Sequence, residues 1–202
     1  MEANNQHITN LIERCKKQDN AAQMEVYKLY FKAMYNTSFR ILKDEFEAED
    51  MMQEAFLTAF TKLKSFKGEV AFGAWLKRIV INKSLTQLKK KNKYNDVKLE
   101  IVHQQEIEDA PISNNNLKAN NVLTQLNNLK ENYRLVLTLN LIEGYDYEEI
   151  AQILNYTNEN VRTTISRAKK KLKQVLLAET TKTAICASLI TIELSLSPAM
   201  SF

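Results

Sequence analysis

Arginine, hydroxyl and lysine side chains between residues 158 and 172 are spaced so that they share one face of a helix. At about 100° per residue, the outward arc of that helix consists of Glu159, Arg162, Thr163, Ser166, Arg167 and Lys170. An arginine can bond a guanine base bidentately, and short hydroxyls can bond phosphates or base edges. Side chains of these types on one arc suit the major groove of duplex DNA.

The residues behind this arc predict two helices that pack at a tight corner. The first helix, from residue 147, has Ile150, Ala151 and Leu154 on its inner face. The second has an apolar stripe at i, i+4, i+7 and i+11 spacing, formed by Val161, Ile165, Ala168 and Leu172. This pattern is typical of a helix-turn-helix, although an ordinary surface helix of a bundle can carry a similar run of charges.

The corner between the two helices needs a residue with a left-handed backbone, for which Gly is commonest and Asn is the next best tolerated. Asn155 occupies that position, and Thr157 or Asn158 can cap the second helix through a side-chain oxygen. Four lysines on the second helix would lie along the phosphate backbone and give salt-dependent affinity: Lys169, Lys170, Lys171 and Lys173. Spacing, corner residue and charge together favour DNA binding over a solvated surface helix.

A second group of charged residues lies at positions 44–54, where the sequence DEFEAEDMMQE holds six acids and no base in a chain of net charge +4. On the helix predicted from Glu47 to Leu63, one polar arc carries Glu49, Asp50, Gln53 and Glu54. None of these acids has a Lys or Arg within a turn, and like charges repel. The arc is therefore either a docking face for a basic partner or a solubilising face whose acids favour the helix dipole.

The next predicted helix, residues 72–91, is basic. Between Trp75 and Lys93 the chain has seven bases and no acid: Lys77, Arg78, Lys83, Lys89, Lys90, Lys91 and Lys93. Phe66, Phe72 and Trp75 flank a short loop that contains glycine. Aromatic rings beside a cationic helix suit single-stranded nucleic acid, since bases stack and lysines hold phosphates. We expect Phe72 and Asn82 to meet a base and Trp75 to belong to the core.

These groups require helices to position them, and the composition of the 202-residue chain favours helices throughout. Apolar residues make up 45% of the sequence, and 3 Gly and 2 Pro leave few helix breakers. We expect an all-α protein with two small helical domains, residues 1–94 and 119–178, joined by a flexible polar linker at 95–118. Residues 179–202 form an apolar tail, which Glu193 and Pro198 interrupt, so we expect a buried or loosely ordered helix instead of a membrane span.

Several classes of protein do not fit this sequence. Cys15 and Cys186 form no CxxC or Cys/His cluster, and the N-terminus lacks the pattern of a signal peptide. We therefore expect a cytoplasmic protein without a disulfide framework, metal site or cofactor. His7 and His103 stand alone in polar segments with no nucleophile near them. No catalytic residue and no small-molecule substrate are expected, and the chain is not expected to be an enzyme.

Two stretches together resemble a known family. Residues 47–85, EAEDMMQEAFLTAFTKLKSFKGEVAFGAWLKRIVINKSL, resemble the core-binding and promoter-melting region, region 2, of extracytoplasmic-function (ECF) RNA polymerase sigma factors. Residues 126–172, LNNLKENYRLVLTLNLIEGYDYEEIAQILNYTNENVRTTISRAKKKL, are similar to their region 4, a helix-turn-helix that reads the −35 promoter element. The likeness runs from about residue 10 to residue 176, in the order of that family.

The resemblance implies partners and roles for the residues above. It implies that Glu49, Asp50, Gln53 and Glu54 dock on core RNA polymerase, which would bind through the basic clamp helices of its β′ subunit and through its β subunit. The −10 element would meet Phe72, Lys77, Arg78, Asn82 and Lys83, with a flipped base held by the loop from Lys67 to Phe72. The −35 element would meet Arg162, Thr163, Ser166, Arg167 and Lys170. An anti-sigma factor that hides these surfaces is also implied.

The sequence departs from the family pattern at three places. Asn155 stands where glycine is frequent, Ser166 replaces a bulkier residue and would alter the preferred −35 sequence, and residues 179–202 have no counterpart and receive no role. The main alternative is a stand-alone helix-turn-helix regulator whose first domain serves oligomerisation or signal sensing. Such a regulator would bind duplex DNA unaided, whereas a sigma factor needs core polymerase.

Overall fold

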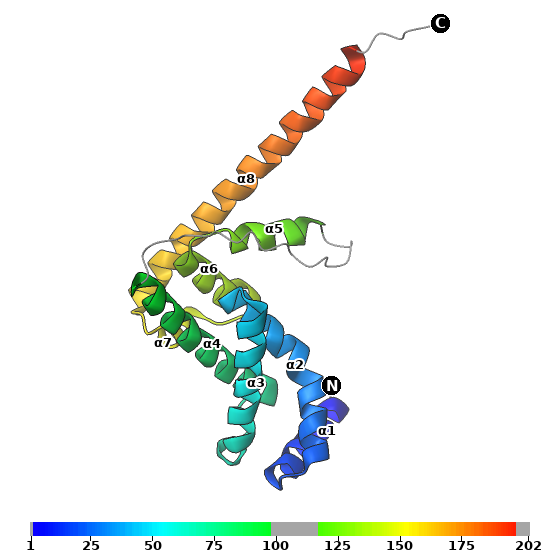
Figure 1. Ribbon diagram of the computed structural model, residues 1–202, viewed down its shortest axis with the longest axis vertical. Coiled ribbons are helices and arrows are strands. Elements are labelled where there is room, and N and C mark those ends of the chain that lie inside the picture. The colour runs from blue at the N-terminus through cyan, green and yellow to red at the C-terminus, as the bar shows by residue number, and fades with distance from the viewer. Residues whose placement is uncertain (1, 98–116, 197–202) are drawn as a thin grey trace, which may run out of the picture. The chain divides into compact units, whose positions relative to one another are not determined.

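The computed structural model of the chain describes residues 2–97 and 117–196, with side chains for residues 6–93 and 120–178. All the regular secondary structure in these ranges is helical, which confirms the all-α prediction. The chain divides into two compact units, Met1–Glu106 and Ile107–Phe202 (Figure 1). Most of the predicted linker lies outside the described residues, but helices extend into both of its ends, to Val97 and from Leu117.

The first unit is a helical bundle. Its elements are α1 (Glu2–Lys16), α2 (Asn20–Leu42), α3 (Glu45–Thr61), the short 3-10 helix η1 (Leu63–Ser65) and α4 (Phe72–Val97). Helices α2, α3 and α4 pack against one another, and α1 packs on α2. The core is formed by apolar side chains from all four α-helices, among them Leu11, Val26, Phe56, Leu76 and Val80.

Side chains at the helix ends explain where α2 and α3 begin. The Asp19 carboxylate accepts the Ala21 and Ala22 N–H groups at 2.9 and 3.1 Å, which satisfies donors at the start of α2. Asp44 does the same for α3, where its carboxylate accepts the Glu47 N–H at 3.0 Å. This cap lets α3 begin at Glu45, two residues earlier than the apolar pattern predicts.

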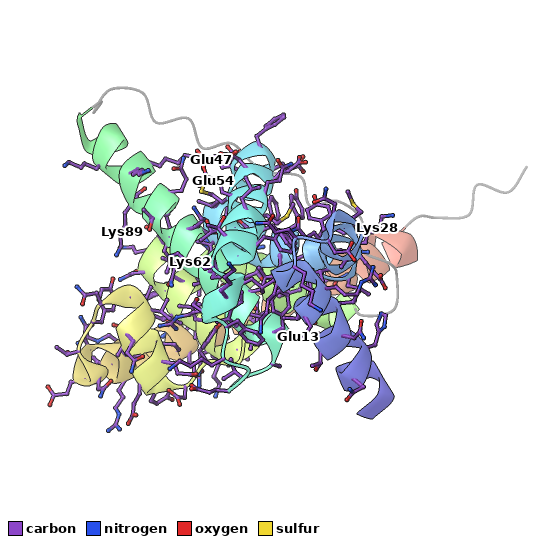
Figure 2. The ribbon with its side chains drawn as sticks, turned by 90° about the horizontal axis from the view of Figure 1, so that it is seen from below. Glu13, Lys28, Glu47, Glu54, Lys62 and Lys89 are labelled. Atoms are coloured by element: carbon purple, nitrogen blue, oxygen red, sulfur yellow. The ribbon has the colours of Figure 1, made fainter. Side chains whose placement is uncertain are left out.

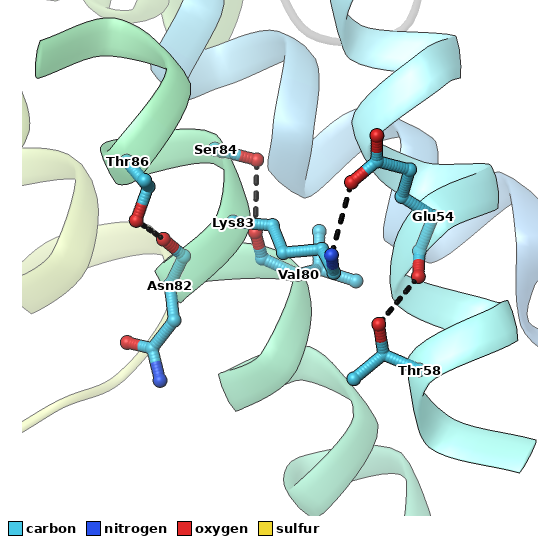
Figure 3. A network of polar contacts seen from close by, with 7 residues as sticks. All are labelled: Glu54, Thr58, Val80, Asn82, Lys83, Ser84 and Thr86. Carbon is cyan, nitrogen blue, oxygen red and sulfur yellow. Dashed lines mark hydrogen bonds and ion pairs between the residues drawn. The ribbon is translucent and has the colours of Figure 1, made fainter. Parts of the chain in front are cut away.

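A buried polar contact fixes the register of α2 on α4. The Ser84 hydroxyl donates to the Val80 carbonyl at 2.9 Å (Figure 3). A hydroxyl has one proton, so Ser84 accepts the hydroxyl hydrogen bond from Ser38, at 2.8 Å. Both serines are fully buried. Their mutual hydrogen bond satisfies the two hydroxyls and joins α2 to α4.

The second unit consists of α5 (Leu117–Asn127), α6 (Glu131–Leu137), the π-helical turn η2 (Thr138–Ile142), α7 (Tyr147–Leu154) and α8 (Asn158–Leu196). Helix α8 packs against α5, α6 and α7. Its core includes Val136, Leu137, Leu139, Ile150 and Ile165. The backbone of α8 continues without a break past residue 178, where we expected the tail to begin (Figure 1). None of the helices in the described part of the chain combines the length and apolar content needed to cross a bilayer.

Candidate protein-docking and nucleic-acid interfaces

The acid face of α3 (Glu49, Asp50, Gln53 and Glu54) is exposed along its whole length. The opposite side of α3 is buried in the core through Ala48, Met52, Ala55, Phe56 and Ala59. Gln53 Nε2 donates to Glu49 Oε1 at 3.1 Å, so this pair is linked along the helix. The sequence therefore assigned the two sides of α3 correctly, and the acids face solvent as a contiguous surface.

Some of the acids in and beside this face have basic partners, which corrects our expectation from the sequence. Lys83 Nζ on α4 lies 2.9 Å from Glu54 Oε2 (Figure 3). Lys91 Nζ lies 3.2 Å from Glu47 Oε2 and 3.7 Å from Asp44 Oδ2. Figure 2 shows Glu47 and Glu54 along α3, with Lys89 projecting from the neighbouring α4. The partners lie on another helix, so a search within one helical turn could not find them.

Two exposed apolar side chains extend the acid face, and the charge pattern of the sequence did not predict them. Phe46 is 86% exposed and Leu57 is 68% exposed. With Asp50 and Gln53 they follow i, i+4, i+7 and i+11 spacing, which is one face of a helix. The same spacing in the sequence could have identified them. A partner of this face thus meets acidic groups flanked by apolar ones.

Phe72 lies in the core, which corrects the prediction that its ring meets a base. Its side chain is only 4% exposed. The ring centroid lies 5.6 Å from those of Tyr30 and Phe66 and 5.7 Å from that of Trp75. Such aromatic packing stabilises a core beyond the burial of area alone. We therefore remove Phe72 from the candidate DNA-binding residues, and Trp75 packs against the core as expected.

The close approach of α4 to α2 beside this cluster depends on a glycine. A Cβ atom at Gly73 would lie 2.9 Å from Tyr30 Cε1, closer than packed atoms tolerate. Gly73 therefore lets the first turn of α4 pack against the Tyr30 ring, which in turn contacts Phe72. The aromatic residues that suggested a stacking surface in the sequence are instead what anchors α4.

The loop before α4 borders a cavity that we did not predict. The cavity has a volume of about 470 Å³ and lies between α1 and the loop. Its lining combines apolar and charged side chains, including Ile12, Lys16, Lys67 and Val70. Gly68 in this loop has φ +78°, a left-handed backbone conformation that glycine adopts without strain. Charges of both signs thus border the cavity, since Glu13 and Glu69 pair with Lys16 and Lys67. Phe72 also belongs to the lining, with a ring that is almost fully buried.

Of the remaining residues predicted on α4, Asn82 is exposed, and Lys77, Arg78 and Lys83 are partly buried. The backbone carbonyl of Asn82 accepts a hydrogen bond from the Thr86 hydroxyl at 2.8 Å, so this bond does not use the Asn82 side-chain amide. Figure 3 shows the Asn82 amide pointing away from the Glu54–Lys83 pair. The side chains of the neighbouring residues Lys83 and Asn82 therefore point in different directions, Lys83 toward α3 and Asn82 toward solvent.

The helix-turn-helix has the local geometry that the sequence predicts. Asp146 and Glu149 form a capping box at the start of α7, with bonds of 2.8 and 2.9 Å. Asn155 ends α7 in the left-handed conformation, with φ 58° and ψ 49°. The Thr157 hydroxyl accepts the Asn160 N–H at 3.2 Å and caps α8. The predicted corner and cap are confirmed.

The outward arc of α8 is exposed in full, and the stripe behind it is buried. Val161, Ile165, Ala168 and Leu172 are all buried. The exposed side comprises Glu159, Arg162, Thr163, Ser166, Arg167 and Lys170, together with Lys169, Lys171 and Lys173. The structure thus brings together every α8 residue that we proposed as a DNA contact.

Comparison with known families matches both units in order. The family model of Sigma-70 region 2 covers residues 26–94, and that of Sigma-70, region 4 covers residues 119–172. The chain is 30% identical over 183 residues to the ECF RNA polymerase sigma factor SigW of Bacillus subtilis, across 84% of this chain and 96% of that protein. It is also 30% identical over 175 residues to the ECF RNA polymerase sigma-E factor of Escherichia coli K12, across 80% of this chain and 90% of that one.

Solved structures share the fold. The sigma factor RpoE of Bartonella quintana, co-crystallised with the anti-sigma factor NepR, aligns with a TM-score of 0.57 at 23% identity over 76% of this chain and 95% of RpoE. CnrH, solved in complex with the cytosolic domain of CnrY, aligns with a TM-score of 0.52 at 23% identity over 83% of this chain and 96% of CnrH. The curated relatives above are sigma factors. With both sigma regions matched in order and relatives at 30% identity aligned over nearly their whole length, the chain belongs to the ECF RNA polymerase sigma factors.

Proposed function

We propose that three exposed surfaces of this sigma factor bind three parts of the transcription initiation complex. The acid face of α3 binds core RNA polymerase, α4 with its preceding loop meets the −10 element, and the arc of α8 reads the −35 element. The chain thereby directs polymerase to a promoter and promotes strand opening. The observation that carries the proposal is that the acid face and the α8 arc are exposed on helices whose opposite sides form the two cores.

The partner of the acid face is a basic surface of core polymerase, the clamp helices of the β′ subunit. Opposite charges across an interface raise the association rate and select the partner. Phe46 and Leu57 on the same side of α3 supply apolar area, which supports a protein partner over a purely electrostatic contact. Asp50, at the centre of this surface, is exposed and forms no ion pair within the described residues.

At the −10 element, Lys77, Arg78 and Lys83 would hold phosphates while Asn82 reads an unpaired base. The exposure of the Asn82 amide supports its role. A base flipped from the stack costs a few kcal/mol, which pocket contacts offset. The cavity beside the loop from Lys67 offers space for a flipped base, although Asn82 is not part of its lining. Phe72 belongs to the lining of that cavity, but its ring is almost fully buried and would support the pocket from the core instead of stacking on the base.

At the −35 element, Arg162, Thr163, Ser166, Arg167 and Lys170 would enter the major groove. For the Arg167→Ala variant we expect weaker discrimination at one base pair of the element, by about 1–3 kcal/mol. The measurement is binding of duplexes that differ at single positions, at one fixed salt concentration. A uniform loss across all duplexes would instead identify Arg167 as a phosphate contact.

We also propose an anti-sigma factor as a regulatory partner and the cytoplasm as the site of action, where core polymerase works. RpoE and CnrH are related folds that were solved bound to an anti-sigma factor and to a cytosolic domain, respectively. A partner of that kind would cover the same exposed surfaces that polymerase and DNA require. Release of the partner would then make the surfaces available.

The test of the proposed function is reconstitution with purified core RNA polymerase. We expect the chain to bind core polymerase and, in that complex, to retain promoter DNA that the chain alone binds poorly. Gel filtration of the mixture measures the first property, and retention of labelled duplex measures the second. A chain that ignores polymerase but binds a specific duplex unaided would be a stand-alone regulator.

A further inference from the structure

The ion pair between Glu54 and Lys83 joins two surfaces to which the proposed function gives different partners. Glu54 belongs to the acid face of α3, and Lys83 is one of the three α4 bases, with Lys77 and Arg78, to which the proposed function assigns phosphates. Lys83 Nζ lies 2.9 Å from Glu54 Oε2 and donates a hydrogen bond to it (Figure 3). The side chain of Glu54 is 48% exposed and that of Lys83 is 28% exposed, so both remain accessible to solvent and to a partner.

Each member of the pair is occupied by the other in the free protein. A lysine that donates to a carboxylate in this geometry is turned toward α3 and is partly neutralised. A glutamate that holds a lysine is likewise a weaker target for a basic protein surface. A DNA phosphate and Glu54 therefore compete for Lys83, and a basic partner and Lys83 compete for Glu54.

We propose that the Glu54–Lys83 ion pair is an intramolecular restraint that couples polymerase docking to single-stranded DNA binding. When a basic polymerase surface takes Glu54, Lys83 is released and turns to a phosphate of the melted strand. Coupling of this kind is reciprocal, so DNA bound at Lys83 also strengthens the docking at Glu54. The inference rests on the proposed function, because it needs Glu54 and Lys83 to have these two partners.

A second contact of the same design lies along the same two helices. Lys91 of α4 is held by Glu47 and Asp44 at the start of α3, at 3.2 and 3.7 Å. These acids lie beside the proposed docking face and not in it, so we assign this contact to the packing of α4 on α3. The Glu54–Lys83 pair differs because both of its members belong to surfaces with external partners.

The expected effect is modest, since partly exposed ion pairs contribute little free energy. Removal of the carboxylate charge in Glu54→Gln is expected to raise the affinity of the chain for single-stranded DNA by about two- to fivefold. The probe is a fluorescein-labelled 20-nucleotide thymidine oligomer, because a phosphate contact does not depend on sequence. Fluorescence anisotropy of the full chain without polymerase measures the affinity.

The matched control is Glu45→Gln, which removes the same charge from the same helix at an exposed acid with no lysine contact within the described residues. If Glu45→Gln raises the affinity as much as Glu54→Gln does, the effect is one of net charge and the inference is wrong. Circular dichroism melting of both variants checks that the fold is retained.

The Lys83→Met variant separates failure of the inference from failure of the proposed function. We expect it to bind the oligomer more weakly than wild type, and we expect Glu54→Gln to have no effect in the Lys83→Met background. If Lys83→Met weakens binding but Glu54→Gln does not strengthen it, the DNA contact stands and the restraint is overturned. If Lys83→Met leaves binding unchanged, the assigned DNA contact fails and the restraint fails with it.

Discussion

The Asp50→Lys/Glu54→Lys variant is expected to lose binding of core RNA polymerase. Both side chains are exposed on α3, while the opposite side of the helix is buried. The substitutions therefore change the charge of the surface and leave the core intact. Like charges placed across an interface cost several kcal/mol, so we expect affinity to fall by roughly 100-fold or more.

The measurement is a pull-down with core polymerase, followed by titration of the variants that still bind. Asp50→Lys alone isolates the docking term, because Asp50 forms no ion pair within the described residues, whereas Glu54→Lys also repels Lys83. The matched control reverses two exposed acids elsewhere, Glu13→Lys/Glu148→Lys, with an equal change in net charge. Unchanged affinity of the double variant, or equal losses in variant and control, would mean that the acid face does not dock polymerase.

The helix-turn-helix could be predicted almost completely from the sequence, because its determinants are local. Four apolar residues at helical spacing define which side of α8 is buried, whatever the rest of the chain does. The corner requires a left-handed backbone at one residue, and asparagine tolerates that conformation. Asn155 therefore marks the position of the corner in the sequence. The acid face of α3 followed in the same way, since burial of one side leaves the other exposed.

The parts that could not be predicted depend on contacts between distant residues. Lys83 and Lys91 find their acids 29 and 44 residues away in the sequence, and no helical period contains that information. Phe72 sits at the start of a helix after a loop, where periodicity does not yet distinguish inside from outside. Its burial is decided by Tyr30 and by the small residue at Gly73, which lets α4 come close to α2.

Opposite charges on α3 and α4 lie next to each other because these two helices pack together. The basic helix α4 would repel a similarly basic neighbour, and the acidic neighbour α3 removes that repulsion. The same neighbour offers an acidic surface to a basic protein. Helices α3 and α4 can therefore stabilise each other through Glu54–Lys83 and Glu47–Lys91 while most of their exposed charge remains for other molecules.

The Phe72→Ala variant is expected to destabilise the first unit by about 3–5 kcal/mol. Its ring is almost fully buried and contacts three other aromatic rings, Tyr30, Phe66 and Trp75. Truncation would leave a cavity that neighbouring rings can fill only in part. Trp75 is the single tryptophan of the chain and lies in this cluster, so its fluorescence reports unfolding of the first unit directly during denaturation with urea.

The matched control is Phe46→Ala, which removes the same side chain from a site that is 86% exposed. Such a surface change is expected to alter stability by no more than about 0.5 kcal/mol. The two variants separate the possible roles of Phe72, because a ring that stacks on a flipped base contributes to DNA affinity and not to folding. If Phe72→Ala retained wild-type stability and lost binding of the single-stranded oligomer, Phe72 would return to the DNA contacts and the core packing described above would be wrong.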